Sequence, residues 1–202
     1  MPHFTEDWHS GHLPHWERLF FELMRWNPAA PRRIVEIGVF EGRATLWFLD
    51  RLLRHPESRI TCLDSFAGGA EHRPEQLTGV EERFRANIAE SDGAGKVEVL
   101  KGPSFDGLVQ LLGRGAQADF VYVDGSHEAP DVLADMVLGW RLLRPGGVMV
   151  CDDYLWSRED TAQVDILGCP KLAIDAFTNI HRRQLDIVLW GYEWQLAFEK
   201  AG

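Results

Sequence analysis

The chain has 202 residues, of which 45% are hydrophobic and 11% aromatic. This length and composition suit a single domain with a large buried core. Acidic residues outnumber lysine and arginine by 31 to 21, which gives a formal net charge of -10. Because nucleic acids and anionic membranes attract basic surfaces, we expect neither among the partners of this protein.

The cysteines and the first residues bear on localisation. Cys62, Cys151 and Cys169 form no CxxC motif, and two of them lie in or beside apolar runs, where cysteine acts as a small hydrophobic residue. The opening MPHFTEDWHS has neither the features of an export signal nor an apolar run long enough to span a bilayer. We therefore expect a cytoplasmic protein.

The first 30 residues differ from the rest of the chain. HLPHWERLFFELMRW, residues 12–26, predicts an amphipathic helix, and a stretch rich in His and Trp precedes it. The segment either caps the sheet that follows or acts as a lid over what binds there. We expect a helical cap or lid at residues 1–30 and the main unit at residues 31–202, within one domain overall. The aromatic residues of the segment also favour a homodimer.

From Arg33 onward, short apolar runs alternate with helical patterns. Five runs predict strands, and they read RIVEIG, RITCLD, KVEVL, DFVYVD and GVMVCD. Helices are predicted between them at residues 44–53, 75–88, 104–112 and 130–143, and the RPGG that follows ends the last of these. This alternation is typical of βαβ units, in which helices cover a parallel sheet.

The C-terminal part predicts one more helix, PKLAIDAFTNIHRR, followed by the strands LDIVLW and YEWQLAF with only Gly191 between them. So short a connection requires an antiparallel pair, because parallel strands need a long crossover. The expected fold class is therefore α/β: a doubly wound, Rossmann-like, seven-stranded sheet that is mostly parallel and has an antiparallel last strand.

The loop after the first strand, VEIGVFEGRAT, indicates the kind of ligand. Gly38 and Gly42 permit a tight turn, but the GxGxxG spacing of dinucleotide-binding proteins fails in both registers, which disfavours a dehydrogenase. Glu36 would repel a pyrophosphate and attract an ammonium or a sulfonium. Asp64, at the end of the second strand, either accepts hydrogen bonds from ribose hydroxyls or is a solvated strand end. Together these residues favour an adenosyl ligand.

Two further strands run directly into acidic residues. FVYV leads to Asp124, and GVMV leads to Asp152 and Asp153. Carboxylates at such strand ends are either solvated termini or parts of a binding site.

The order of these motifs from Arg33 to Tyr154, with GPSFD after the third strand and VDGSH after the fourth, resembles the class I S-adenosylmethionine (SAM) methyltransferases. It is most similar to small-molecule O-methyltransferases of the catechol O-methyltransferase kind and to bacterial methyltransferase domain 24 proteins. The similarity covers roughly residues 13–199.

The resemblance implies SAM as cofactor and S-adenosylhomocysteine (SAH) as product. Glu36, Gly38, Phe40 and Gly42 would surround the methionine part. The remaining implied cofactor residues are Asp64 at the ribose, Gly102 and Ser104 at the adenine, and Asp124 and Ser126 in the pocket wall.

The resemblance also implies a magnesium ion held by Asp124, Asp152 and Asp153, where Asp153 replaces the amide of the catechol enzymes. Three close carboxylates repel one another unless a cation lies between them, and oxygen ligands suit Mg²⁺. His127 occupies the place of a lysine general base, so His127 and Asp124 are the predicted catalytic residues. Alternatively, Asp152 caps a loop, Asp153 faces water, and His127 binds substrate or caps the next helix.

The resulting expectation is a SAM-dependent, Mg²⁺-dependent O-methylation of a hydroxylated small molecule such as a catechol-like ring or a sugar diol. Alternatives are metal-independent transfer to oxygen or nitrogen of a small molecule, and a methyltransferase-like binding or scaffold domain. Methylation of nucleobase nitrogens is disfavoured because DGSH stands where those enzymes place an Asn/Asp-Pro-Pro-aromatic stretch.

Overall fold

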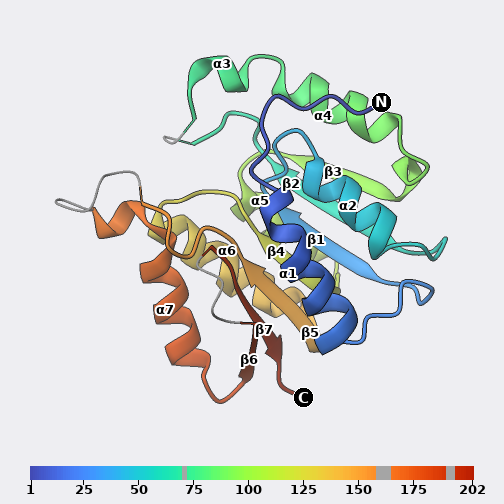
Figure 1. Cartoon of the computed structure of the whole chain (residues 1–202). Coiled ribbons are helices and arrows are strands. Elements are labelled where there is room, and N and C mark those ends of the chain that lie inside the picture. The colour runs from blue at the N-terminus through green and yellow to red at the C-terminus, as the bar shows by residue number, and fades with distance from the viewer. Residues whose placement is uncertain (70–71, 158–164, 190–193) are drawn as a thin grey trace.

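The computed structural model describes residues 1–69, 72–157, 165–189 and 194–202 (Figure 1). Its centre is a seven-stranded sheet in the order β3-β2-β1-β4-β5-β7-β6. Strands β1 to β5 run parallel to one another, and β7 runs antiparallel to both β5 and β6. The expected α/β fold is therefore confirmed. The strands are β1 (Arg33–Ile37), β2 (Arg59–Asp64), β3 (Val97–Lys101), β4 (Ala118–Val123), β5 (Leu143–Cys151), β6 (Leu185–Leu189) and β7 (Leu196–Lys200).

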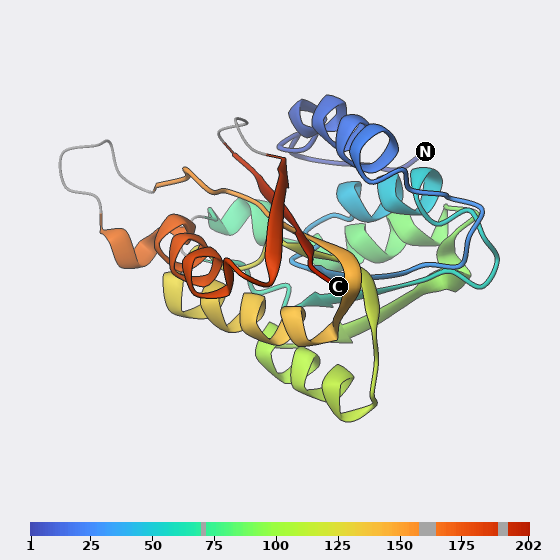
Figure 2. The same cartoon turned by 90° about the horizontal axis from the view of Figure 1, so that it is seen from below.

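Helices cover both faces of the sheet, as the view in Figure 2 shows. One layer contains α5, α6 and α7, and the other contains α2, α4 and the N-terminal helical run. The helices are α2 (Arg43–Arg51), α3 (Pro74–Leu77), α4 (Val80–Ala89), α5 (Ser104–Gly113), α6 (Ala129–Leu142) and α7 (Pro170–His181).

Strand β4 shows how the sequence produces this sandwich. All six of its residues are buried, as expected for a central parallel strand with helices on both sides. Because side chains alternate along a strand, Val121 and Val123 pack into the core beneath α5 to α7, whereas Phe120 and Tyr122 pack into the core beneath α2 and the N-terminal run.

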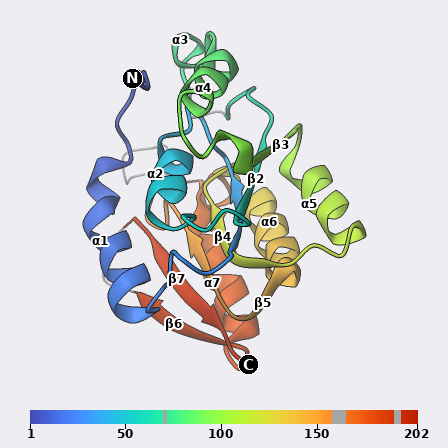
Figure 3. The ribbon, with the colours of Figure 1, turned by 90° about the vertical axis from the view of Figure 1, so that its right-hand side faces the viewer.

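The N-terminal helical run contributes directly to the second core. It consists of a 3-10 turn (Ser10–His12), α1 (Leu13–Glu17) and a π-helical turn (Arg18–Leu23), and Figure 3 shows it beside α2. Trp16 is fully buried, and its ring centre lies 4.8 Å from that of Phe48 and 5.3 Å from that of Tyr122. None of the described helices is long and apolar enough to cross a bilayer.

Two predicted elements differ from the structure. The helix expected at residues 75–88 is divided into α3 and α4, because Gly79 adopts a left-handed conformation (φ 67°) that ends one helix before the next begins. The helix before RPGG ends as expected, at Leu142, but strand β5 begins directly after it, at Leu143, and so includes the RPGG that precedes the predicted strand GVMVCD. The connection expected at Gly191 lies outside the described residues.

Candidate functional site

A cavity of about 990 Å³ opens beyond the carboxyl ends of β1, β2, β4 and β5. Open α/β sheets bind their ligands at this edge, and the volume lies at the upper end of the range for small-molecule sites. All but one of the site residues expected from the sequence line it. They are Glu36, Gly38, Phe40, Asp64, Gly102, Ser104, Asp124, Ser126, His127, Asp152 and Asp153; Gly42 does not line it.

The loop after β1 requires glycine at two positions. Gly38 has a φ of +80°, and a Cβ there would lie 1.9 Å from the carbonyl oxygen of Asp124. The loop can therefore pass the end of β4 only with glycine. Gly42 has a φ of +81°, and a Cβ there would approach the Phe84 ring to 2.9 Å. Its role is to start α2 against α4.

Asp64 holds this loop in shape. Its Oδ2 accepts hydrogen bonds from the backbone N–H of Val39 (2.7 Å) and Phe40 (3.1 Å), and its Oδ1 accepts one from Phe66 (2.7 Å). A carboxylate offers about four acceptor positions, so three are in use. The expected contact with both ribose hydroxyls stays a prediction, and only one acceptor position is left for it in this arrangement.

Glu36 is fully buried, and only one of its carboxylate oxygens has a partner. Oε2 accepts hydrogen bonds from Thr45 Oγ1 (2.8 Å) and Cys62 Sγ (3.7 Å), whereas Oε1 has no hydrogen-bond partner among the described residues. Burial raises the pKa of Glu36 to about 8, against the effect of these two hydrogen bonds. A buried acceptor without a partner in a cavity wall suits a ligand that brings a donor, such as an ammonium.

The expected adenine residues, Gly102 and Ser104, line the same cavity. Gly102 donates its N–H to the carbonyl of Asp64 (3.0 Å), and Ser104 begins α5. Ser126 belongs to the loop after β4, where its hydroxyl donates to Asp131 Oδ2 (3.0 Å). The structure therefore brings these positions to one cavity, and their contacts with a cofactor stay predictions.

The structure also brings Asp124, Asp152 and Asp153 together, because β4 and β5 are adjacent and their last residues, Val123 and Cys151, pair with each other. Burial raises the pKa of Asp124 well above its usual value, and the charges of Asp152 and Asp153 raise it further. Burial and the charge of Asp153 likewise raise the pKa of Asp152. The three carboxyl groups therefore repel one another when ionised.

Several donors already hold one of these carboxylates, that of Asp152. Asp152 Oδ2 accepts hydrogen bonds from the Tyr122 hydroxyl and from Gln195 Nε2 (3.0 Å), and its Oδ1 accepts the N–H of Asp153 (2.8 Å). Among the described residues, no group of three or more His, Cys, Asp or Glu side chains is already arranged to hold a metal. The oxygen donors and the uncompensated charge suit a divalent cation chemically, so magnesium stays a prediction.

His127 forms a pair with Asp153 rather than standing apart from the acids. Its Nε2 lies 2.7 Å from Asp153 Oδ2, and its ring stacks on Trp156 with the centres 4.0 Å apart and the planes 21° from parallel. These two contacts fix the position and tilt of the imidazole. A second histidine, His12 of the N-terminal run, has its Nε2 3.8 Å from Asp152 Oδ2.

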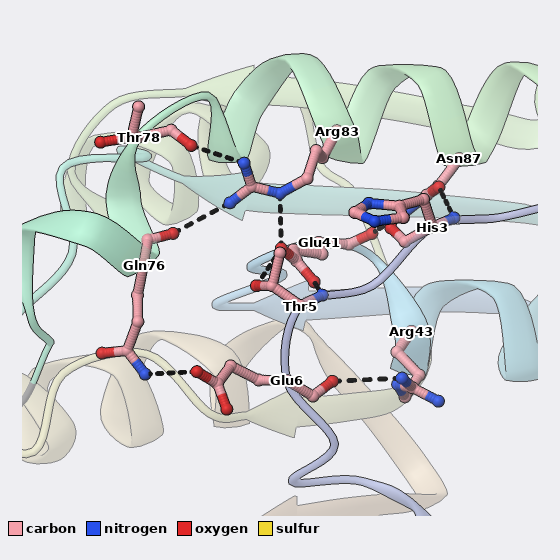
Figure 4. A network of polar contacts seen from close by, with 9 residues as sticks. All are labelled: His3, Thr5, Glu6, Glu41, Arg43, Gln76, Thr78, Arg83 and Asn87. Atoms are coloured by element: carbon pink, nitrogen blue, oxygen red, sulfur yellow. Dashed lines mark hydrogen bonds and ion pairs between the residues drawn. The ribbon is translucent and has the colours of Figure 1, made fainter.

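Sequence reasoning missed the network that ties residues 3–8, here the N-terminal strap, to the rest of the site (Figure 4). Glu41 is 1% exposed, and its carboxylate accepts bonds from Thr5 N and Oγ1 (2.7 Å each) and from Arg83 Nε (2.5 Å). Asn87 binds both the N–H and the carbonyl of His3. Burial acts to raise the pKa of Glu41, but the bonds from Thr5 and Arg83 outweigh burial and lower it.

The strap reaches the cavity itself. Gln76 donates to Glu6 Oε1 (3.0 Å), and Trp8 packs against Phe40 and His72 with ring centres 4.9 Å and 5.8 Å apart. The strap therefore covers the loop after β1. Its hydrogen-bond partners outside the N-terminal segment lie 36 to 84 residues away in the chain, so no local spacing in the sequence indicates them.

Comparison with known proteins agrees with this geometry. A family model described as "Methyltransferase domain" matches residues 35–154. The chain is 30% identical to O-methyltransferase hkm8 of Aspergillus hancockii over 63% of this chain and 45% of that protein. It is 31% identical to the catechol O-methyltransferase of Mycobacterium tuberculosis over 61% of this chain and 49% of that protein. The matched part thus spans about half the length of these curated relatives.

Solved structures share the fold. The O-methyltransferase TomG from Streptomyces achromogenes, in complex with SAM, has a TM-score of 0.65 at 22% identity and covers 94% of this chain and 80% of its own. The MycE methyltransferase, in complex with Mg, SAH and mycinamycin VI, has a TM-score of 0.60 at 18% identity and covers 97% of this chain and 50% of its own.

Proposed function

Because the chain belongs to the methyltransferase domain family, we propose that it is a SAM-dependent O-methyltransferase that acts on hydroxylated small molecules. One observation carries the proposal: a single cavity contains both the unpartnered Oε1 of Glu36 and the His127–Asp153 pair. The first suits the ammonium of a methionine group, and the second suits a hydroxyl that loses its proton. SAM would supply a methyl group on a sulfonium. In the transfer, the acceptor oxygen forms a bond to the methyl carbon as the C–S bond breaks, and the electron pair of that bond stays on sulfur.

At the cofactor end, the chain supplies shape and charge. Glu36 Oε1 accepts a hydrogen bond from the ammonium, and Gly38 allows the loop to pass close to the ligand. Asp64 accepts a hydrogen bond from a ribose hydroxyl while it also holds the loop after β1. Gly102 and Ser104 lie at the adenine.

At the acceptor end, His127 removes the proton of the reacting hydroxyl. Asp153 Oδ2, 2.7 Å from Nε2, stabilises the imidazolium that forms, and stacking on Trp156 keeps the ring in place. Asp124, which is half-buried and lines the same cavity, accepts a hydrogen bond from the substrate hydroxyl. These residues orient the oxygen for displacement and exclude water from it.

We propose that Asp124, Asp152 and Asp153 hold a magnesium ion, which lowers the pKa of a substrate hydroxyl and favours a catechol-like ring or a sugar diol. The mutual repulsion of the three acids supports this proposal. The pairing of Asp153 with His127 favours a second candidate, in which the same transfer proceeds without a metal to oxygen or nitrogen of a small molecule.

Methyl transfer from isotopically labelled SAM separates these proposals. 4-Methylcatechol and a methyl glycoside serve as acceptors, in Mg²⁺ and in EDTA, with wild-type protein and an Asp152→Ala, Asp153→Ala variant. Labelled methyl ether that depends on Mg²⁺ and is lost in the variant supports the metal-dependent reaction. Transfer that persists in EDTA supports the metal-free reaction. If neither acceptor is methylated and SAM does not bind, the protein is not a methyltransferase, and a scaffold function becomes the better explanation.

A further inference from the structure

The cavity is strongly acidic. Among the described residues that line it there is one arginine, Arg43, and no lysine. The cavity also suits a ligand with a donor group, since the buried Glu36 lines it and its Oε1 has no hydrogen-bond partner among the described residues. Nine acidic residues line it, and arginines outside the lining pair with two of them, Glu6 and Glu41; the nine are Glu6, Glu36, Glu41, Asp64, Asp124, Glu128, Asp131, Asp152 and Asp153.

The one arginine is engaged at the strap and does not offset the acids beyond β4 and β5. Arg43 Nη2 donates to the carbonyl of Glu6 (3.1 Å), Nε lies 3.8 Å from Asp7 Oδ1, and the guanidinium lies 4.1 Å from the ring centre of Phe4. No arginine or lysine of the described residues forms an ion pair with the three acids after β4 and β5. Among the described residues, the basic side chains that approach these acids are two histidines, His12 and His127.

More negative charge lies where α6 begins. Glu128 and Asp131 are exposed and line the same cavity next to His127. A divalent cation among the three aspartates would offset only two of their charges and none of the charge on Glu128 and Asp131. An acceptor with a carboxylate or phosphate close to its reacting hydroxyl would therefore meet net repulsion in a partly desolvated site.

We propose that the methyl acceptor is a neutral or cationic hydroxylated molecule, and that the cavity rejects acceptors with a carboxylate, phosphate or sulfate near the reacting hydroxyl. This inference rests on the proposed function, and it adds the charge of the substrate to it. Hydroxyl and ammonium groups donate hydrogen bonds to the carboxylates of the cavity, whereas an ionised carboxylate, phosphate or sulfate group has no hydrogen to donate.

Two matched sets of acceptors test the proposal with the full chain saturated with SAH, in Mg²⁺ and in EDTA. One set consists of 4-ethylcatechol, its amine and its carboxylate counterparts; the other consists of methyl glucoside, methyl glucosaminide and methyl glucuronide. In calorimetric titrations, the neutral and amine acceptors should bind at least about tenfold more tightly than the carboxylate of the same set. Equal or tighter binding of a carboxylate overturns the proposal, and so does rejection of all neutral and amine forms. Failure of SAH itself to bind instead overturns the proposed function.

A charge variant shows whether the cavity lining is responsible. Glu128→Gln with Asp131→Asn removes two charges outside the predicted catalytic and metal residues and should reduce the preference for amine over carboxylate by at least about threefold. The matched control is Glu57→Gln with Asp50→Asn, two exposed acids that do not line the cavity. An unchanged preference in the first variant, or an equal change in both, contradicts the proposal.

Discussion

Trp16 Nε1 donates a hydrogen bond to Gln195 Oε1 over 2.7 Å, which joins the N-terminal helical run to the residue before β7. This bond orients the amide so that Gln195 Nε2 points to Asp152 Oδ2 at 3.0 Å. Gln195 is 1% exposed and Trp16 is fully buried. Docking of the N-terminal run therefore helps to position one of the three acids of the site.

Gln195→Leu should lower the free energy of unfolding by about 1–3 kcal/mol, because it leaves Trp16 Nε1 without its buried acceptor and removes a donor from Asp152. Urea denaturation measures the change. Gln110→Leu, at an exposed position of α5, is the control and should stay within about 0.5 kcal/mol of wild type. Equal effects of the two substitutions would show that the Gln195 contacts add nothing to stability.

Glu36 should make the protein less stable as the pH rises. Its folded-state pKa is raised from 4.5 to about 8, so between these values the folded state keeps a proton that the unfolded state has lost. The free energy of unfolding then falls with pH through this window and levels off above the folded-state pKa. Glu36→Gln has no group that titrates at this position, so it lacks this pH-dependent loss of stability. Denaturation at both ends of the window should show that the variant gains stability relative to wild type as the pH rises; a constant difference would rule out the raised pKa.

Glu41→Gln should loosen the N-terminal strap. The charged acceptor of two Thr5 bonds and of Arg83 is lost, while the buried core beneath the strap is untouched. Hydrogen exchange of residues 3–8 should become at least about tenfold faster, because an amide of the strap is protected only while its bond is formed. The control is Glu82→Gln on the exposed side of α4. Unchanged exchange in the Glu41 variant would mean that other contacts hold the strap.

Asp153→Asn should separate charge from geometry at the acceptor end. Asparagine keeps an oxygen near His127 but removes one negative charge from the three acids. Under the metal proposal, Mg²⁺ affinity measured by calorimetry should fall about tenfold or more, whereas SAH binding in EDTA should change by less than about twofold. Asp50→Asn, an exposed change on α2, should alter neither. Retention of wild-type Mg²⁺ affinity would show that the negative charge of Asp153 contributes nothing to metal binding, because the amide oxygen of asparagine can still be a ligand.

The sequence predicted the sheet well because its strands are apolar runs that helices bury on both faces. Strand β4 is the clearest case, since all six of its residues are buried. The acids at the ends of β4 and β5 were predicted to meet, and they do, because neighbouring parallel strands end at one edge. The break between α3 and α4 at Gly79 does have a local signal, because a glycine within a helical pattern can end a helix. The apolar periodicity of residues 75–88 nevertheless favoured one continuous helix.

The residues that sequence reasoning missed act over long separations. Gln195 contacts Trp16 across 179 residues, and Thr5 contacts Glu41 across 36. Such contacts arise only once the chain has folded, so no spacing rule indicates them. Asp64 shows a different limit: its place at the end of β2 suggested ribose binding, and the structure adds that it holds the loop after β1.

Calorimetric titration with SAH tests the proposed function most directly. Wild-type protein should bind one SAH per chain, and Glu36→Gln should bind it at least about tenfold more weakly above the pKa of Glu36, because the variant cannot provide a negative charge for the ammonium. Thermal unfolding of the same samples confirms that the variant is folded. Absence of SAH binding to the folded wild-type protein, with and without Mg²⁺, would contradict the assignment as a SAM-dependent methyltransferase.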